Sequence, residues 1–479
     1  MRSLDILVIC VYLVAVVWAG LACRGKKSNS AEFFTGKGGF SSKLGTVLVG
    51  LSIAATLFSG LSFVIYTSTA YGYGAKIILG AVGIPIAWAV LRFWFLPRYL
   101  AANGAHPYDI IEQRFGPAVR LTVSAMFILM RIGWMGAMLA APTLVVMGSA
   151  NLGPAWFWPI VLTTGIACTF YTTIGGIRSV IITDAIQFLI IILSLLFIIG
   201  FILLRLDLSP LAILGELHDA GRLHILDFSF NFTETYTFWG VLVGLTISGL
   251  GTYLADMMML QRYLAADSPQ AAARAFAVNM WGAVIVIISL VTVGLLLWVW
   301  YQHHPNPLIP LKNDQVLAYF IARELPAGVS GLLIAAIMAA TMSSMTSGII
   351  AIAGTITNDW TTRFGRHRTS AELFRYGQKV SITIGVLSTL AGGFTAQLDS
   401  LFQVSQTVLG VFLGPMLGCM VLVVTKNRIS TAGVLTGMAL GTAAGWAVIA
   451  CPVSFIWVAP VSSAFTIVGA HLLPRKAAT

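Results

Sequence analysis

The sequence has few charged residues and few cysteines, and both scarcities limit what the chain can be. Only 9% of its 479 residues are charged, whereas roughly 25% are charged in typical soluble domains. The five cysteines lie singly in or beside apolar runs, without the spacing of a metal site or of a disulfide framework. No nucleophile–base pair, phosphate-binding loop or metal-ligand cluster is evident, so the sequence predicts no enzyme activity and no redox chemistry.

Apolar residues dominate instead. They make up 58% of the chain, and the mean hydropathy is +0.90, which is typical of integral membrane proteins. The formal net charge is +11, but the basic residues are scattered through short loops, as in the positive-inside bias of membrane loops. We therefore expect the lipid bilayer to surround the chain, and we expect no nucleic-acid partner and no obligate protein partner.

Apolar runs of spanning length recur throughout, which predicts an all-α integral membrane protein with one transmembrane domain, 1–479. Clusters of basic residues all fall on one side when the N-terminus is outside and the C-terminus is cytoplasmic. Thirteen alternating spans require opposite termini, so the count agrees with a multi-pass protein of the plasma (inner) membrane. The runs lie at 4–22, 44–70, 74–95, 121–147, 155–174, 180–204, 238–260, 276–300, 329–356, 380–397, 400–424, 431–451 and 454–473.

The first run is expected to remain as a span. Arg24, Lys26 and Lys27 follow it, whereas a cleaved signal peptide carries its positive charge before the apolar region. Residues 1–30 are therefore predicted to form an extra N-terminal span.

Two similar heptapeptides indicate an internal duplication. Val47–Ile53 opens the second span and Val241–Ile247 opens the seventh, and Gly- and Ser-interrupted stretches follow at 54–62 and 248–252. Interrupted spans in corresponding positions of two inverted halves are typical of transporters. The alternative is a chance match of seven apolar and small residues. The predicted halves are 44–205 and 238–424, with two further spans in 431–473.

The ninth span carries the densest polar cluster of the chain. Ala340, Ser343, Ser344 and Ser347 fall on one helical face, with Thr346 beside them. Hydroxyl and carbonyl oxygens suit small, hard cations. The alternative is that these small residues only allow close helix packing.

The second span offers a facing partner for this cluster. A helix break around 54–60 would free the backbone carbonyls of Ala54 and Leu57. Unpaired carbonyls within a membrane are tolerated only where something such as an ion satisfies them.

A carboxylate and an arginine also lie within predicted spans. Asp184 and Gln187 are three residues apart and share a helix face, and an intramembrane carboxylate usually marks an ion or substrate path. The alternative is an ion pair between Asp184 and Arg178. Arg131 lies roughly 18 Å into the fourth span at the helical rise and needs a partner. That partner is either a carboxylate-bearing substrate or, within the protein, Asp256 or helix carbonyls.

Three motifs together resemble the sodium–solute symporter family. Gly175–Gln187 is similar to the family's Gly-Gly-x-Lys/Arg-x-Val-x-x-Thr-Asp-x-x-Gln pattern, Gln261-Arg262-Tyr263 to its Gln-Arg-Tyr loop, and Ser343–Ser347 to its sodium-site span. Some features resemble the iodide, monocarboxylate and multivitamin branch, and others the sialic-acid branch. The resemblance implies a LeuT-type fold with five plus five inverted spans.

The resemblance also implies where Na⁺ binds. The shared sodium site of the family corresponds here to the carbonyls of Ala54, Leu57 and Ala340 and the hydroxyls of Ser343 and Ser344. A second sodium site, present in some members, corresponds to a further set of residues, Asp184, Ser343, Thr346 and Ser347.

The solute site is implied beside the interrupted spans, at Thr56, Phe58 and Ser59. Gln406 corresponds to a glutamine that contacts sugar in the glucose-transporting branch. Arg131 resembles the arginine of the sialic-acid branch, although that arginine lies about one turn later.

These features predict sodium-coupled symport of a small organic solute into the cell by alternating access. A carboxylate-bearing solute, such as a monocarboxylate or sialic acid, is favoured because of Arg131. The alternatives are a sugar or an inorganic anion as the solute, a solute sensor that uses the same fold, and an ion channel.

Overall fold

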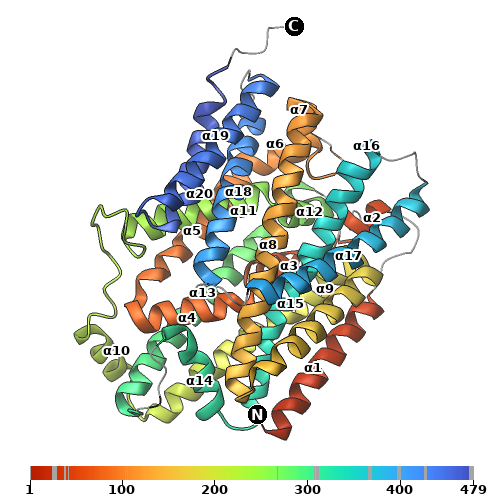
Figure 1. The fold of residues 1–479 in the computed structure, drawn as a ribbon. Coiled ribbons are helices and arrows are strands. Elements are labelled where there is room, and N and C mark those ends of the chain that lie inside the picture. The colour runs from red at the N-terminus through yellow and green to blue at the C-terminus, as the bar shows by residue number, and fades with distance from the viewer. Residues whose placement is uncertain are drawn as a thin grey trace.

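The computed structural model describes the chain except residues 1, 24–29, 37–38, 41, 103, 105, 267, 307, 309–311, 365–368, 396–400, 426–428 and 474–479. Every regular element within the described residues is a helix, which confirms the all-α prediction for that part of the chain. In Figure 1, α1 begins at the bottom of the molecule and α19 and α20 stand near the top.

The α-helices are α1 (Ser3–Ala22), α2 (Ser30–Thr35), α3 (Lys43–Leu57), α4 (Gly60–Tyr73), α5 (Gly80–Ala89), α6 (Leu96–Ala101), α7 (Asp109–Phe115), α8 (Pro117–Ala150), α9 (Phe157–Leu206), α10 (Pro210–Asp219), α11 (Thr246–Ala255), α12 (Met257–Ala265), α13 (Pro269–His303), α14 (Val316–Arg323), α15 (Val329–Thr355), α16 (Thr362–Phe364), α17 (Ser370–Thr395), α18 (Leu401–Val424), α19 (Thr431–Ala450) and α20 (Val458–Gly469). Short 3₁₀ segments lie at Gly74–Leu79, Pro154–Trp156, Asn313–Gln315 and Phe455–Trp457. Wider π-helical turns lie at Val90–Phe95, Gly240–Leu245 and Ile356–Thr361.

The helices occupy the regions of the predicted apolar runs, but the count of thirteen spans stays a prediction. Within the described residues, eight helices are long and apolar enough to cross a bilayer, or nine when the bent pair α11–α12 counts as one span. The expected spans 155–174 and 180–204 fall on two helical stretches within α9, which meet at a kink where Gly176 has non-helical backbone angles. Gly176 has φ +63°, a backbone conformation that glycine adopts readily.

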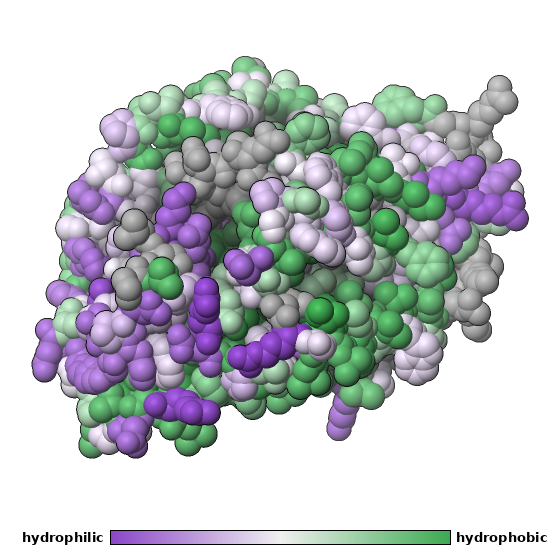
Figure 2. Space-filling view, turned by 60° about the horizontal axis from the view of Figure 1, so that its bottom comes forward, coloured by the Kyte–Doolittle hydropathy of each residue, from purple (hydrophilic) through white to green (hydrophobic). Residues whose placement is uncertain are grey.

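The molecular surface is that of a membrane protein. Large apolar side chains are exposed along α1, α9 and α17; for example, Trp18 is 71% exposed and Phe394 76%. Soluble monomers rarely expose extended apolar patches. Figure 2 views the end that carries α10 and α14, with hydrophilic residues gathered on one side and hydrophobic residues over much of the rest.

The first interrupted helix breaks where the sequence predicts, between α3 and α4. Phe58 ends α3 in an extended conformation, and Ser59 begins α4 with a capping box in which its N–H donates to Ser62 Oγ at 3.2 Å. Gly60 lies against α15 so closely that a Cβ there would approach Thr341 Oγ1 to 2.4 Å. Only glycine allows this close contact, so the break between α3 and α4 packs directly against α15.

The second interrupted helix breaks at Asp256, one turn later than the Ser248–Thr252 stretch that the sequence suggested. Asp256 has extended angles, and α11 and α12 meet there at a bend of 54°. Its Oδ1 accepts a hydrogen bond from the Met258 N–H at 2.9 Å, so the aspartate caps α12. The position of this break is therefore set by the Asp256 N-cap of α12 and not by the glycines and serine of residues 248–252.

Candidate functional site

The hydroxyl-rich face of α15 contacts the broken end of α3. Ser343 Oγ donates to the Ala55 carbonyl at 3.0 Å, and Ser344 Oγ donates to the Thr56 carbonyl at 3.0 Å. Both hydroxyls also lie 3.0 and 3.2 Å from the Ala340 carbonyl. The two serines and Ala340 are fully buried, so this contact between the helices is made away from lipid and water.

The broken end of α3 also leaves two further carbonyls. The last four carbonyls of an α-helix have no partner within it, and in α3 they belong to Ala54, Ala55, Thr56 and Leu57. Serine hydroxyls of α15 satisfy the middle two. The remaining two carbonyls, those of Ala54 and Leu57, belong to the predicted sodium set. They are the first and last carbonyls of the turn that α15 contacts. The donor set is therefore oxygen throughout, as a small hard cation requires.

Asp184 lies at the centre of a buried polar cluster between α9, α3, α12 and α15. Its Oδ2 accepts hydrogen bonds from Ser52 Oγ at 2.7 Å and from Arg262 Nη2 at 2.8 Å. Thr56 Oγ1 lies 3.3 Å away and Ser347 Oγ 3.4 Å. Asp184 and Gln187 are both fully buried, which confirms that their shared face points away from lipid.

The partner of Asp184 is Arg262, so the alternative of an ion pair with Arg178 is wrong. Arg178 is exposed, whereas Arg262 is fully buried. Arg262 Nη2 also donates to Ser347 Oγ at 2.5 Å, and its Nε donates to Ser52 Oγ at 2.9 Å. The guanidinium therefore lies between two members of the predicted second sodium set, Asp184 and Ser347.

The other members of that second set face elsewhere. Thr346 Oγ1 donates to the carbonyls of Met342 and Ser343 on its own helix, and Ser343 bonds to α3. Asp184 Oδ1 is buried, with no hydrogen-bond partner in the described part of the chain. The structure thus brings Asp184 and Ser347 together around Arg262 and leaves one carboxylate oxygen unpaired.

A cavity of about 220 Å³ lies beside both helix breaks. Its lining is mostly apolar, with a few hydroxyl, amide and guanidinium groups. Such an arrangement is typical of small-molecule sites. All five residues predicted to contact the solute line it: Thr56, Phe58, Ser59, Arg131 and Gln406.

Arg131 forms an ion pair with Asp256 at the break between α11 and α12. Both side chains are buried, at 2% and 0% exposure. Of the partners that the sequence allows for Arg131, the structure therefore shows Asp256. The guanidinium carbon also lies 4.4 Å from the ring centre of Trp134, a cation–π distance. Nε and Nη1 of Arg131 find no hydrogen-bond partner within the described residues.

Two tyrosines satisfy carbonyls at the second break. Tyr108 Oη donates to the Ala255 carbonyl at 3.0 Å, and Tyr263 Oη donates to the Tyr253 carbonyl at 3.0 Å. Tyr253 itself lines the cavity. Sequence reasoning gave none of these residues a role and named Arg262 only as part of a motif. The Gln-Arg-Tyr motif was the available signal for Arg262, whose partner Asp184 lies 78 residues away in the sequence.

Comparisons with known proteins relate the chain to sodium-coupled transporters. The model of the sodium:solute symporter family matches residues 33–441. The chain is 30% identical to the human sodium/iodide cotransporter over 89% of its own length and 66% of that protein, so it spans about two thirds of this relative. It is 26% identical to the sodium/sialic acid symporter of Aliivibrio fischeri over 91% of its length and 86% of that protein.

A solved structure shares the fold. A Na⁺-coupled sialic acid symporter, in a substrate-bound outward-open state, superposes with a TM-score of 0.90 over 99% of each chain at 24% identity. The family match covers most of the chain, and a relative at 30% identity accompanies it. This chain therefore belongs to the sodium:solute symporter family of membrane transporters.

Proposed function

We propose that the chain is a sodium-coupled symporter for a small anionic solute that carries a carboxylate. One observation supports this most directly. Arg131 lines the cavity beside both helix breaks, it is buried, and two of its nitrogens have no hydrogen-bond partner among the described residues. Buried donors of this kind cost free energy unless they are paired, and a carboxylate matches them in charge and geometry.

The transported sodium ion is proposed to bind between α3 and α15. Its ligands are the carbonyls of Ala54, Leu57 and Ala340 and the hydroxyls of Ser343 and Ser344. Support comes from the contact of both serines with the last turn of α3. A sodium ion would accept lone pairs from the two carbonyls that no hydroxyl reaches.

Coupling between ion and solute is proposed to run through one turn of α3. The Thr56 carbonyl accepts a hydrogen bond from Ser344, while Thr56 and Leu57 also line the solute cavity. An ion that orders this turn would therefore complete the cavity wall. By linkage, the solute then raises sodium affinity by the same factor. One charge crossing about 100 mV contributes about 2.3 kcal/mol, and one half would rock against the other to release both inward.

Asp256 is proposed to act as the resting counter-charge of Arg131. It neutralises the guanidinium in the structure, and a solute carboxylate would share or replace it. Asp256 also caps α12. A solute that displaces Asp256 from Arg131 would therefore also affect the break in the second interrupted helix.

The number of sodium ions, the topology and the repeats are part of the same proposal. A second ion at Asp184, Ser343, Thr346 and Ser347 would have to compete with Arg262 or use the unpaired Oδ1 of Asp184.

Thirteen spans, with the N-terminus outside and the C-terminus cytoplasmic, would place the basic loops inside. The halves 44–205 and 238–424 each contain one interrupted helix, at Phe58 and at Asp256, as inverted repeats of transporters do.

Iodide transport by the human relative supports the alternative of an inorganic anion, because iodide is also an anion. A neutral sugar would leave Arg131 paired only with Asp256. A sensor would bind solute without net flux, and a channel would conduct without saturation.

The test is uptake into proteoliposomes under an imposed sodium gradient, with a panel of carboxylates, their amides, sugars and inorganic anions. We expect saturable, sodium-dependent uptake of an acid but not of its amide. Arg131→Gln should reduce affinity for the acid by about a hundredfold or more, since a buried charge pair broken from one side costs about 3–5 kcal/mol. Arg98→Gln, at an exposed arginine, is the control. Uptake of a neutral sugar that Arg131→Gln leaves unchanged would reject the anionic solute.

A further inference from the structure

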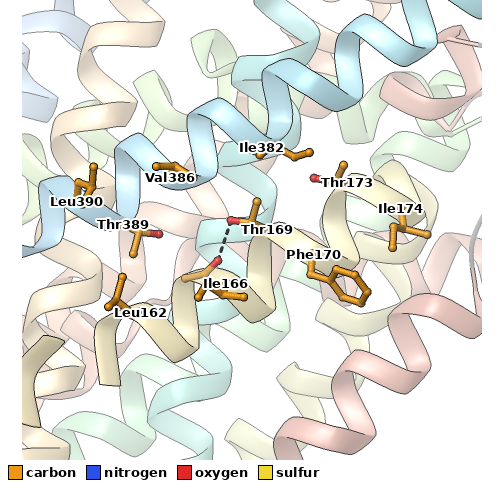
Figure 3. A pocket seen from close by; sticks show the side chains of 11 residues that line it. Leu162, Ile166, Thr169, Phe170, Thr173, Ile174, Ile382, Val386, Thr389 and Leu390 are labelled. Atoms are coloured by element: carbon orange, nitrogen blue, oxygen red, sulfur yellow. Dashed lines mark hydrogen bonds between the residues drawn. The ribbon is translucent and has the colours of Figure 1, made fainter. Parts of the chain in front are cut away.

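An apolar groove lies between α9 and α17, away from the solute cavity. Its volume is about 460 Å³, within the range of small-molecule pockets, roughly 300–1,000 Å³. Figure 3 shows side chains from both helices along it. The lining residues are Leu162, Gly165, Ile166, Thr169, Phe170, Thr173, Ile174, Ile382, Val386, Thr389 and Leu390.

Two reciprocal Gly–Thr contacts make the floor of this groove. A Cβ on Gly165 would approach Thr389 Oγ1 to 2.2 Å, and a Cβ on Gly385 would approach Thr169 Oγ1 to 2.1 Å. Small residues of this kind let two helices approach closely. Each of the two threonines donates its hydroxyl to its own helix at 2.7 Å. The floor therefore offers no spare hydroxyl donor at these two positions and suits a hydrocarbon occupant.

The walls of the groove are bulky apolar side chains that remain exposed. Ile166 is 65% exposed, Phe170 51% and Val386 51%. These residues would face the bilayer, where the occupant that is always present is lipid. From Leu162 to Ile174 the groove follows roughly 18 Å of helix at the helical rise. That length is close to the hydrocarbon depth of one leaflet, about half of the ~30 Å bilayer core.

One end of the groove is basic. On α17, Lys379 precedes Ile382 by three residues and Arg375 precedes Lys379 by four, so these cations extend the helix face that lines the groove. Gln378 Nε2 donates to the Thr173 carbonyl at 2.9 Å, which joins this part of α17 to the same end of α9. Arg178 follows shortly after on α9, and all three cations are exposed.

Among the described residues, these three cations have no acidic partner. No ion pair within the described ranges involves Arg178, Arg375 or Lys379. Basic clusters at the membrane surface attract anionic headgroups. The apolar groove and the basic end together match one molecule, with a hydrocarbon chain and a negative head.

We propose that the groove between α9 and α17 binds one acyl chain of an anionic phospholipid, whose headgroup contacts Arg178, Arg375 and Lys379. The lipid belongs to the leaflet on the side of the basic loops. It bridges α9, which carries Asp184, and α17, which packs on α8 and α9. This site is independent of the proposed solute and requires no transport activity to test.

Native mass spectrometry of the purified full-length protein tests the proposal. Phosphatidylglycerol and phosphatidylcholine with the same acyl chains are added at matched concentrations. We expect one phosphatidylglycerol molecule to be retained at activation energies that remove phosphatidylcholine. Equal retention of both lipids would overturn the proposal, and so would a dimer whose formation excludes the lipid.

Two variants localise the binding. Arg375→Gln with Lys379→Gln should weaken phosphatidylglycerol binding tenfold or more, and Val386→Trp should reduce binding of both lipids by filling the groove. Arg92→Gln with Arg98→Gln removes two exposed cations elsewhere and should leave binding unchanged. If the control pair reduces binding as much as the α17 pair, the effect is one of total charge and the site is rejected.

Discussion

Arg262 and Asp184 form an ion pair in which both side chains are fully buried, with Nη2 and Oδ2 separated by 2.8 Å. The two residues lie on α12 and α9, and the same guanidinium reaches Ser52 on α3 and Ser347 on α15. One cation thus connects both interrupted helices to the hydroxyl-bearing helix. Any rearrangement of α12 relative to α9 has to break or carry this pair.

Removing one partner of this pair is expected to destabilise the protein more than removing both. Asp184→Asn or Arg262→Gln alone leaves a buried charge uncompensated, which costs about 3–5 kcal/mol. The double variant removes both charges, so its loss of stability should be smaller than that of either single variant. Chemical unfolding in detergent of the wild type, both single variants and the double variant measures this coupling. Additive losses would show that the two side chains act independently.

Asp184→Asn also tests whether the protein binds one sodium ion or two. If Asp184 binds a second ion, the variant should lower the Hill coefficient for sodium towards one and leave the first site occupied. Ser52→Ala, which removes a hydrogen bond to the same carboxylate but no predicted ligand, is the control. A wild-type coefficient near one, together with a one-to-one flux ratio, would reject the second ion.

Local patterns were sufficient to predict the α3 break and the serine face of α15. The contact of Ser343 and Ser344 with the end of α3 could be predicted from short stretches, but the carbonyls that they reach are those of Ala55 and Thr56, not the predicted carbonyls of Ala54 and Leu57. The partners of the charged residues could not be read in this way. Arg262 reaches Asp184 across 78 residues of sequence, and it does so because Asp256 caps α12 and turns it by 54°. Spacing along the chain carries no information on such a turn.

Asp256→Asn is expected to increase the stabilisation that an anionic solute provides. Asparagine caps a helix about as well as aspartate, so α12 keeps its start while Arg131 loses its counter-charge. The variant should unfold at a lower temperature without solute and recover part of this loss when the acid is added. Thermal unfolding with and without solute gives the two shifts. A solute-induced shift no larger than that of the wild type would contradict the proposed exchange of counter-charges.

Tyr108→Phe is expected to weaken the attachment of the start of α7 to the second interrupted helix. The Ala255 carbonyl would lose its hydrogen bond from Tyr108, and a buried unpaired group costs about 1–3 kcal/mol. Because this contact fixes the end of α11, apparent sodium affinity should fall several-fold as well. Tyr99→Phe is a matched control, since Tyr99 is also buried and donates from α6 to the Pro107 carbonyl at 3.0 Å, just before α7. Equal effects of both variants on sodium affinity would assign Tyr108 to general stability.

Ser343→Ala combined with Ser344→Ala tests the proposed sodium site. The two hydroxyls donate to the Ala55 and Thr56 carbonyls, so their loss removes two proposed ligands and two contacts between α3 and α15. We expect the double variant to insert and fold with reduced stability but to lose the rise in unfolding temperature that sodium gives the wild type. Thr355→Ala is the control, because Thr355 lies on the same helix and donates only to its own Ala351 carbonyl. Sodium should still stabilise Thr355→Ala. If sodium stabilises the serine double variant with unchanged affinity, the ion binds elsewhere, and the oxygens of Ala54, Leu57 and Ala340 lose their assigned role with it.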